Sequence, residues 1–344
     1  MEKLDAINQM IMDNSPELLD PGLLHGKMGV CLYFFYLSRK SGKADHLAFA
    51  EKLLDEVYKQ VNDKSLNCGF GDGLAGIAWA INHLIQARFV EADPDEILEE
   101  VEDTVFRYLV SQTDFQLGLL EGLLGYLAYL VYRLDHPGTV SPDKEFVLKR
   151  LMVEVLNHIG ASIDERKLRV NEPPFLNFMW DLPLCLLMLA KAYSLQYHQN
   201  KISRILENLS PAILSYFPLH SANKLFLIYG MTEVLRQVDI PLWQNHLNIL
   251  KEHLDLPYLL DIELKDKNLF LSNGLAGISF LLKHLPQEHL TGNQALIMEK
   301  IFTSEYMVSH IKGISEKKPV IGLSRGLSGI GLTYILSLNH KATS

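Results

Sequence analysis

The sequence predicts an all-α protein in which seven inner and seven outer helices close into a double-layered (α/α)7 barrel, a toroid. A Gly-x-x-Gly motif recurs about every 50 residues, and such a period is the signature of a repeat fold. Each copy opens an apolar run, and an amphipathic run of helical period lies between successive copies. No segment alternates apolar and polar residues in the manner of a strand, so no sheet is expected.

The motif has five clear copies and two degraded ones. The clear copies begin at Gly26, Gly73, Gly122, Gly274 and Gly326. The degraded copies fill the gap after the third, and they read Trp180-Asp181-Leu182-Pro183-Leu184 and Tyr229-Gly230-Met231-Thr232-Glu233. Helix starts would crowd together at the rim of a barrel, and glycine allows close approach because it has no Cβ. We therefore expect most of the glycine pairs to be packing positions.

The helices fall into two classes. The predicted inner helices are apolar nearly all round, as buried helices are, and examples are 30–37, 77–84, 126–134, 184–192, 278–285 and 330–338. The predicted outer helices keep a polar face and cover 4–12, 46–61, 94–111, 143–158, 201–216, 241–254 and 293–311. An open stack of repeats needs polar ends, yet the last repeat is among the most apolar. Closure into a ring removes the ends.

Composition indicates one domain, residues 1–344, because no linker interrupts the repeats. The net charge of −9 and the scattered lysines and arginines argue against nucleic acid and anionic membranes as partners. The apolar runs are too short for membrane insertion, and the first residues lack the apolar core of a signal peptide. Three cysteines cannot form a disulfide framework, so a cytoplasmic location with reduced thiols is expected.

The chain resembles the lanthionine synthetase C-like (LanC-like) family. The likeness rests on Leu23-Leu24-His25-Gly26 with Gly29, and on the runs 73–77, 274–278 and 322–331. It extends over essentially the whole chain and implies the same helical barrel. It also implies a role in modifying ribosomally made peptides. The family's cyclases join a peptide cysteine to a dehydrated serine or threonine, and a zinc ion makes the thiolate.

The resemblance implies that the zinc ligands are missing. The fifth-repeat cysteine of the family aligns with Ile228, and the cysteine–histidine pair of the sixth repeat aligns with Ser272 and Asn273. Isoleucine, serine and asparagine do not supply the thiolate or imidazole ligands that zinc prefers. We therefore expect neither a metal nor another cofactor. Two further family positions, an aspartate and a histidine, fall at Gly118 and Trp180.

Part of the family's active site persists, because Lys224 replaces an arginine and Tyr229 keeps a tyrosine. The residue before each first glycine should project near the central opening. These residues form a mostly polar ring: His25, Asp72, Glu121, Trp180, Tyr229, Asn273 and Arg325. His25, Tyr229 and Lys224 are the catalytic candidates. The substrate-binding candidates are Asp72, Glu121, Trp180, Asn273 and Arg325.

Structural roles stay open for the same residues. His25 could bond the neighbouring repeat, Asp72 and Glu121 could cap helices, and Arg325 could pair with either carboxylate. Unpaired amides at the converging helix N-termini predict a positive potential at the mouth, to which Lys27, Lys224 and Arg325 would add. Cys68 is either a thiol near the mouth or a buried residue. The loop 171–174 is either a lid or a plain insertion.

Three functions are compatible with these features. The first is a LanC-like protein that binds a precursor peptide at the mouth, either as a zinc-independent thioether-forming cyclase or as a non-catalytic scaffold for a peptide-modifying enzyme. The second is a carbohydrate-active α/α-barrel enzyme in which Asp72 and Glu121 act as acid and base. The third is an interaction module that works through its outer helices. The substrate and the oligomeric state are not determined by the sequence.

Overall fold

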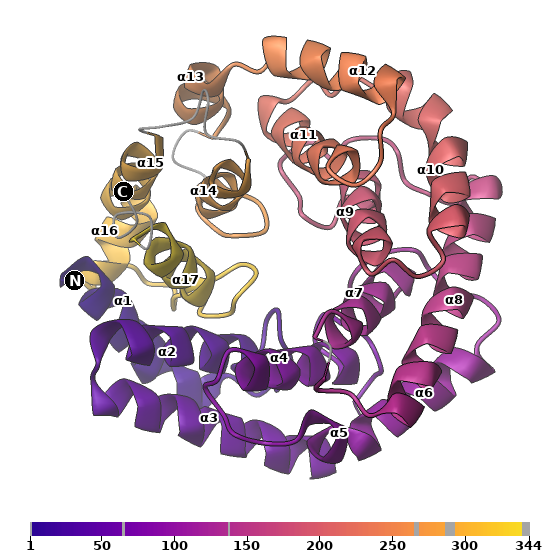
Figure 1. Ribbon diagram of the computed structural model, residues 1–344. Helices are drawn as coiled ribbons and strands as arrows, with labels where there is room; N and C mark the ends of the chain where they lie inside the picture. The colour runs from indigo at the N-terminus through magenta and orange to yellow at the C-terminus, as the bar shows by residue number, and fades with distance from the viewer. Residues whose placement is uncertain (1, 64–65, 137, 265–267, 286–292, 339–344) are drawn as a thin grey trace.

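The computed structural model describes residues 2–63, 66–136, 138–264, 268–285 and 293–338. Within these ranges the regular structure is helical throughout and contains no strand. Figure 1 shows the helices in two concentric rings. In the same ranges, no helix is both long and apolar enough to cross a membrane.

The inner ring is closed. In the described part of the chain it consists of α2 (Lys27–Ser41), α4 (Leu74–Gln86), α7 (Leu123–Leu134), α9 (Asp181–Ser194), α11 (Ser221–Leu235), α14 (Leu275–His284) and α17 (Leu327–Leu338). Each of these helices packs on the next, and α17 packs on α2 (Figure 1). The predicted double-layered barrel is therefore confirmed.

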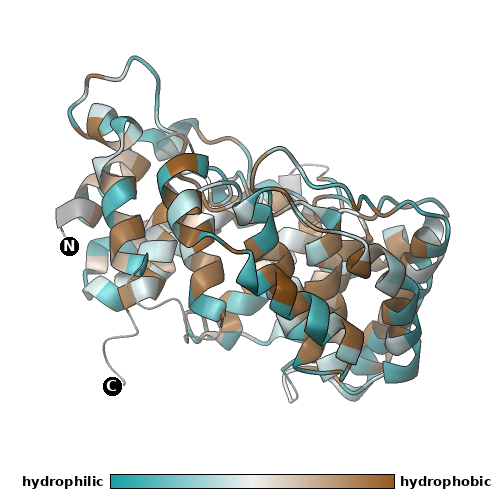
Figure 2. Ribbon diagram, turned by 90° about the horizontal axis from the view of Figure 1, so that it is seen from above, coloured by the Kyte–Doolittle hydropathy of each residue, from teal (hydrophilic) through white to brown (hydrophobic). Residues whose placement is uncertain are grey.

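Each inner helix is covered by one outer helix. The outer helices are α3 (Ala44–Asp63), α6 (Glu99–Ser111), α8 (Pro142–Asp164), α10 (Gln199–Leu214), α12 (Pro241–Glu252) and α15 (Asn293–Thr303), on α2, α4, α7, α9, α11 and α14 respectively. The first helix, α1 (Glu2–Asn14), covers the last inner helix, α17, so the first and last described helices of the chain pack together. Figure 2 shows hydrophilic and hydrophobic residues side by side on the outer helices, as expected of amphipathic helices.

Two outer helices predicted as continuous are broken. Leu98 separates α5 (Pro94–Ile97) from α6, and Ser304 separates α15 from α16 (Glu305–Ile311). The hydroxyl of Ser304 accepts a hydrogen bond from Met307 N at 3.3 Å, and so caps the second piece. Three short elements complete the described structure: η1 (Ser15–Glu17), α13 (Leu256–Tyr258) and η2 (Leu259–Glu263).

A turn at the rim leads into the inner helix in five repeats. The N–H of the first helical residue donates to the carbonyl seven residues earlier, at 2.8–2.9 Å in every case. The donor–acceptor pairs are Lys27–Asp20, Leu74–Asn67, Leu123–Gln116, Leu275–Asn268 and Leu327–Val320. Glycine is required in this turn, since a Cβ at Gly73 would lie 2.4 Å from Asn67 O.

The second glycine of the motif lets adjacent repeats approach. A Cβ on Gly76 would lie 1.9 Å from the carbonyl oxygen of Phe70 and 3.3 Å from Leu23 Cβ in the preceding repeat. Gly29 meets Leu323 in the same way, and Gly125 meets Phe70. The prediction that the glycine pairs serve packing is confirmed at these positions.

Backbone hydrogen bonds link the rim turns to one another. Ser272 N donates to Ser324 O at 3.0 Å, and Ser324 N donates to Leu24 O at 2.8 Å. The series continues from Leu24 N to Gly71 O at 2.9 Å and from Gly71 N to Leu120 O at 2.8 Å. Because this belt joins the last repeat to the first, it holds the ring closed at the rim.

The fifth repeat departs from the prediction. Its inner helix, α11, begins at Ser221, so the expected opening at Tyr229-Gly230 is wrong. Gly230 lies inside α11 and packs on α9, where its Cβ would be 2.9 Å from Pro183 O. Glutamates cap α11 instead of a glycine turn, because Ser221 N donates to Glu263 at 2.8 Å and Leu219 N donates to Glu172 at 2.8 Å.

Candidate functional site at the barrel rim

The rim turns of the first two repeats bring His25 and Asp72 together. His25 Nδ1 lies 2.6 Å from Asp72 Oδ2, while Leu24 N and His25 N donate to Oδ1 at 3.1 and 2.8 Å. The imidazole orientation is therefore fixed. The His25 side chain stays 45% exposed, and none of the described residues hydrogen-bonds to its Nε2. This is an oriented imidazole with one accessible nitrogen.

The contact between His25 and Asp72 shifts the pKa of both side chains. The hydrogen bond that the His25 ring donates to Asp72 raises the pKa of His25 above its ordinary value, although partial burial and the charge of Arg325 oppose the rise. Burial alone would raise the pKa of Asp72, but the hydrogen bonds from His25 and Leu24 outweigh it and lower the pKa. Asp72 is thus an ionised partner that positions the His25 ring.

Asp72 and Glu121 share a cavity of about 260 Å³ at the rim. Its walls come from the turns of the second and third repeats and from the connection between α8 and α9, which contributes Arg169. Arg169 binds Asp181 through Nε at 2.7 Å and Nη2 at 3.1 Å, a bidentate pair. The Arg169 side chain is exposed, whereas the Asp181 side chain is buried.

Sequence reasoning missed this Arg169–Asp181 pair. Arg169 lies in a connection without any periodic pattern, and nothing in its neighbourhood distinguishes it. Asp181 had one usable signal, because it is the first residue of an apolar inner helix, where an acid favours the helix start. The pair lies beside Gly118, whose Cβ would be 3.7 Å from Arg169 Nη2 and 3.8 Å from Asp181 Oδ1.

Three predicted mouth residues do not reach the opening, so their expected placement is wrong. Trp180 is buried at the start of α9, and its indole N–H donates to Val170 O at 3.1 Å. Tyr229 lies about two turns into α11, beside His284, the last residue of α14, and burial raises its pKa to about 12. Lys224 is buried and donates to His253 O at 2.8 Å.

The other predicted residues remain at the rim. His25, Glu121 and Arg325 are exposed there. Asn273 is half-buried in the sixth-repeat turn, and its Oδ1 has no hydrogen-bond partner among the described residues. The hydroxyl of the adjacent Ser272 is buried and likewise unpartnered in that part of the chain. The roles of Glu121, Asn273 and Arg325 in substrate binding remain predictions.

Unpaired backbone amides are the expected source of a positive potential at the mouth, but within the described rim most of these amides are hydrogen-bonded. The first amides of five inner helices bond to their own turns, and those of α11 bond to Glu263. Lys27 faces the outer ring and pairs with Glu56 on α3 at 2.6 Å. Because these donors are already used, any anion at the rim would have to meet side chains such as Arg169 and Arg325.

The positions that the resemblance gives to zinc ligands do not fit a zinc ion. Ile228 is buried inside α11, and Ser272 and Asn273 offer only neutral oxygen and amide groups. Across the described residues, no group of three or more His, Cys, Asp or Glu side chains could hold a metal. Cys68 is half-buried, and burial raises the pKa of its thiol, which makes it a poor nucleophile.

Comparison with known proteins agrees with this architecture. The family model described as lanthionine synthetase C-like protein matches residues 17–172. Among solved structures, one described as nisin cyclase is similar with a TM-score of 0.67 and 13% sequence identity, covering 98% of this chain and 94% of that chain. No curated protein sequence matches the chain. The matched segment contains the first three glycine turns, including His25, Asp72 and Glu121. Residues 17–172 therefore match the LanC-like family model, and the chain as a whole shares the helical fold of that solved structure.

Proposed function

We propose that this protein belongs to a lanthipeptide-type modification pathway, binds a precursor peptide at the rim cavity and closes thioether rings without zinc. His25 would be the general base, and Asp72 would position it. The 2.6 Å contact between His25 Nδ1 and Asp72 Oδ2 carries the proposal, because it orients the ring and leaves Nε2 free to accept a proton. The match of residues 17–172 to the LanC-like family model supports the substrate class.

The proposed step adds a thiol across a carbon–carbon double bond. A cysteine thiol of the peptide is mostly protonated at neutral pH, since its pKa is about 8.5. Neutral His25 takes this proton at Nε2, and the thiolate attacks the β-carbon of a dehydrated serine or threonine. The π electrons move to the α-carbon and its carbonyl as an enolate, and the imidazolium then protonates the α-carbon. The S–H and π bonds break while C–S and C–H bonds form, so no oxidant or reductant is needed.

Two arginine side chains near the His25–Asp72 dyad could stabilise the negative charge that forms during the reaction. The charge of Arg325 acts on His25, and Arg169 lines the same cavity as Asp72. A guanidinium beside an enolate oxygen stabilises the negative charge that develops in the addition. We assign this role to Arg325, because Arg169 is already bonded to Asp181.

The geometry favours the cyclase over a carbohydrate-active enzyme. Asp72 accepts three hydrogen bonds and its pKa is lowered, so it is a poor proton donor. Trp180, which would have been a stacking surface for a sugar, is buried. Asp72 is therefore unsuited to the acid role in a pair with Glu121.

Ring closure on a synthetic peptide tests the proposal. The peptide carries one cysteine and one dehydroalanine, and alkylation of the remaining thiol followed by mass spectrometry measures the uncyclised fraction. Wild-type protein treated with EDTA should accelerate ring formation over the uncatalysed rate. His25→Ala should lose about 100-fold of that rate or more. His198→Asn, which alters an exposed histidine of the outer ring, should not.

Other outcomes are equally decisive. Saturable peptide binding without any acceleration would leave only the non-catalytic scaffold. Full activity in His25→Ala would remove the assigned base, and activity that is lost with EDTA would remove the zinc-independent step.

A further inference from the structure

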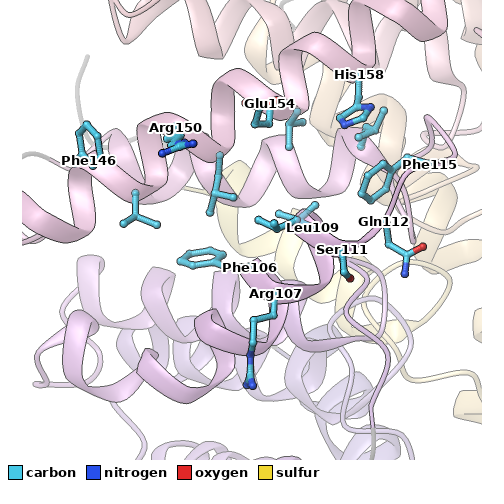
Figure 3. Close-up of a pocket in the computed structure, with 15 residues that line it drawn as sticks. Phe106, Arg107, Leu109, Ser111, Gln112, Phe115, Phe146, Arg150, Glu154 and His158 are labelled. Atoms are coloured by element: carbon cyan, nitrogen blue, oxygen red, sulfur yellow. The ribbon is translucent and has the colours of Figure 1, made fainter.

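A groove lies on the outside of the barrel between α6 and α8 (Figure 3). It encloses about 680 Å³. Figure 3 shows Phe106 and Leu109 facing the helix that carries Phe146, Arg150 and Glu154. The α8 wall is regular, because Phe146, Arg150, Glu154 and His158 are four residues apart and share one helix face. From Phe146 to His158 this wall is about 18 Å long, which suits a helix of about three turns.

The apolar side chains in this groove are unusually exposed. Val110 is 76% exposed, Phe146 68% and Val147 41%. Single exposed apolar residues are common on proteins, but here they converge on one concave surface. Such a surface gains free energy when another apolar face covers it, and an amphipathic helix supplies one.

Charge decides what kind of helix fits. Arg150 stands on the α8 wall and Arg107 at the α6 edge, and both are exposed. Within the described residues neither forms an ion pair, and Arg107 donates only to the backbone carbonyl of Asp103, at 3.0 Å. Two unpaired guanidiniums against the single carboxylate of Glu154 make the groove locally basic on a chain of net charge −9. Acidic side chains flanking the apolar face would complement it.

Along the chain, the groove lies near the rim cavity described above. Phe115 and Leu123 line the groove, and their chain neighbours Gln116 and Gly122 line the cavity that contains Asp72 and Glu121. Successive Cα atoms are about 3.8 Å apart, so only the rim turn of the third repeat separates the two sites. A single extended peptide could occupy both.

We propose that the α6–α8 groove binds an acidic amphipathic helical segment of the same peptide whose neighbouring part reaches the rim cavity. The inference rests on the proposed function for the identity of the peptide. It adds a second recognition site, remote from His25, that would raise the local concentration of the reacting segment at the rim.

Two designed peptides test the groove directly. Both are about 14 residues long, carry the same leucine stripe at helical spacing and a fluorescent label, and differ only in having Glu or Lys on the polar face. Fluorescence anisotropy with the full chain should show binding of the Glu peptide, and roughly tenfold weaker binding of the Lys peptide. The double variant Arg107→Glu/Arg150→Glu should reverse that preference.

Surface variants locate the binding. The variant Phe146→Asp should lose most of the affinity for the Glu peptide. Leu242→Asp, which alters a residue 65% exposed on α12, is the matched control and should bind like wild type. Equal binding of the Glu and Lys peptides, no binding of either, or unchanged binding by a folded Phe146→Asp variant would overturn the proposal.

Failure of the rim chemistry can be told apart from failure of the groove. His25→Ala should keep full affinity for the Glu peptide, because the groove does not use His25. The Glu peptide extended by the cysteine–dehydroalanine segment should be cyclised with a lower KM than that segment alone. Helix binding without any cyclisation would reject the proposed function and keep the groove. Cyclisation with an unchanged KM would reject the link between the two sites.

Discussion

His25 Nδ1 and Asp72 Oδ2 lie 2.6 Å apart although 47 residues separate them in the chain. The two residues occupy the same place in successive rim turns, directly before the first glycine. Gly22 makes the contact possible, because a Cβ there would lie 2.4 Å from Asp72 Cα and 2.5 Å from Asp72 Cβ. The repeat geometry thus assembles a histidine–carboxylate dyad from residues far apart in the sequence.

Replacing Asp72 should shift the titration of His25. Asp72 raises the pKa of His25 by hydrogen bonding to its ring, so Asp72→Asn should lower that pKa. The neutral, basic form of His25 would then predominate from a lower pH, and the rising limb of the pH–rate profile should move to lower pH. NMR titration of the imidazole resonances measures the shift. Asp13→Asn on α1 is the control, and an unchanged midpoint in Asp72→Asn would contradict the dyad.

A methyl group on a rim glycine should destabilise the barrel. In Gly76→Ala the new Cβ would lie 1.9 Å from Phe70 O, which is backbone and cannot turn aside. We expect a loss of about 1–3 kcal/mol in the free energy of unfolding, measured by urea denaturation. Gly160→Ala in α8 is the matched control, because its Cβ meets only Ile205 at 3.6–3.8 Å. It should gain about 0.5–1 kcal/mol from helix propensity. Equal effects of the two substitutions would contradict the packing role.

The sequence predicts the barrel well because, in most repeats, a glycine motif marks the residue at which the inner helix begins. In the clear copies the glycines mark the start, and Gly26, Gly73, Gly122 and Gly274 are the N-caps of their helices. The fifth repeat has no such mark. Its helix is buried on nearly every side, so no alternation of an apolar and a polar face marks where the helix begins.

The site is harder to predict than the fold because its partners come from distant segments. The carboxylates that cap α11 belong to Glu172 and Glu263, on either side of the helix in sequence. Nothing local marks Ser221 as a helix start without them. The motif therefore predicts Tyr229 at the mouth, about two turns from its place in the structure. The sequence does predict that His25 and Asp72 lie at the mouth, because both belong to complete glycine turns, where position in the repeat fixes position in space.

The glutamate caps of α11 should contribute measurably to stability. Glu263→Ala removes the acceptor for Ser221 N and Ala222 N, which are held at 2.8 and 2.9 Å. Loss of such a cap should cost about 0.5–2 kcal/mol of unfolding free energy, measured by urea denaturation. Glu252→Ala removes a glutamate from the last turn of α12, where an acid opposes the helix dipole, and should cost nothing. A Glu263→Ala variant as stable as wild type would show that these amides find other acceptors.

A buried ionic cluster ties the outer ring to the inner ring. Arg133 on α7 donates to Glu102 on α6 at 2.7 Å and to Asp95 at 2.6 Å, and the side chains of Arg133 and Glu102 are both fully buried. Arg133→Met should cost about 3–5 kcal/mol of unfolding free energy, because it leaves Glu102 buried with only Lys144 as a charged partner. Adding Glu102→Leu removes that buried charge and should recover part of the loss. Additive losses in the double variant would show that the two residues are not coupled.

Metal removal should leave the protein unchanged. The side chains at the family's zinc positions are Ile228, Ser272 and Asn273, and a zinc ion prefers thiolate or imidazole ligands. Elemental analysis of the purified protein should therefore find far less than one zinc per chain. EDTA should not lower the Tm, since a bound metal would stabilise the folded state and its removal would show as a drop. A structural zinc elsewhere in the fold would give stoichiometric metal and a Tm that falls with EDTA. That result would contradict the prediction of a metal-free protein, whereas the zinc-independent step is tested by ring formation after EDTA treatment.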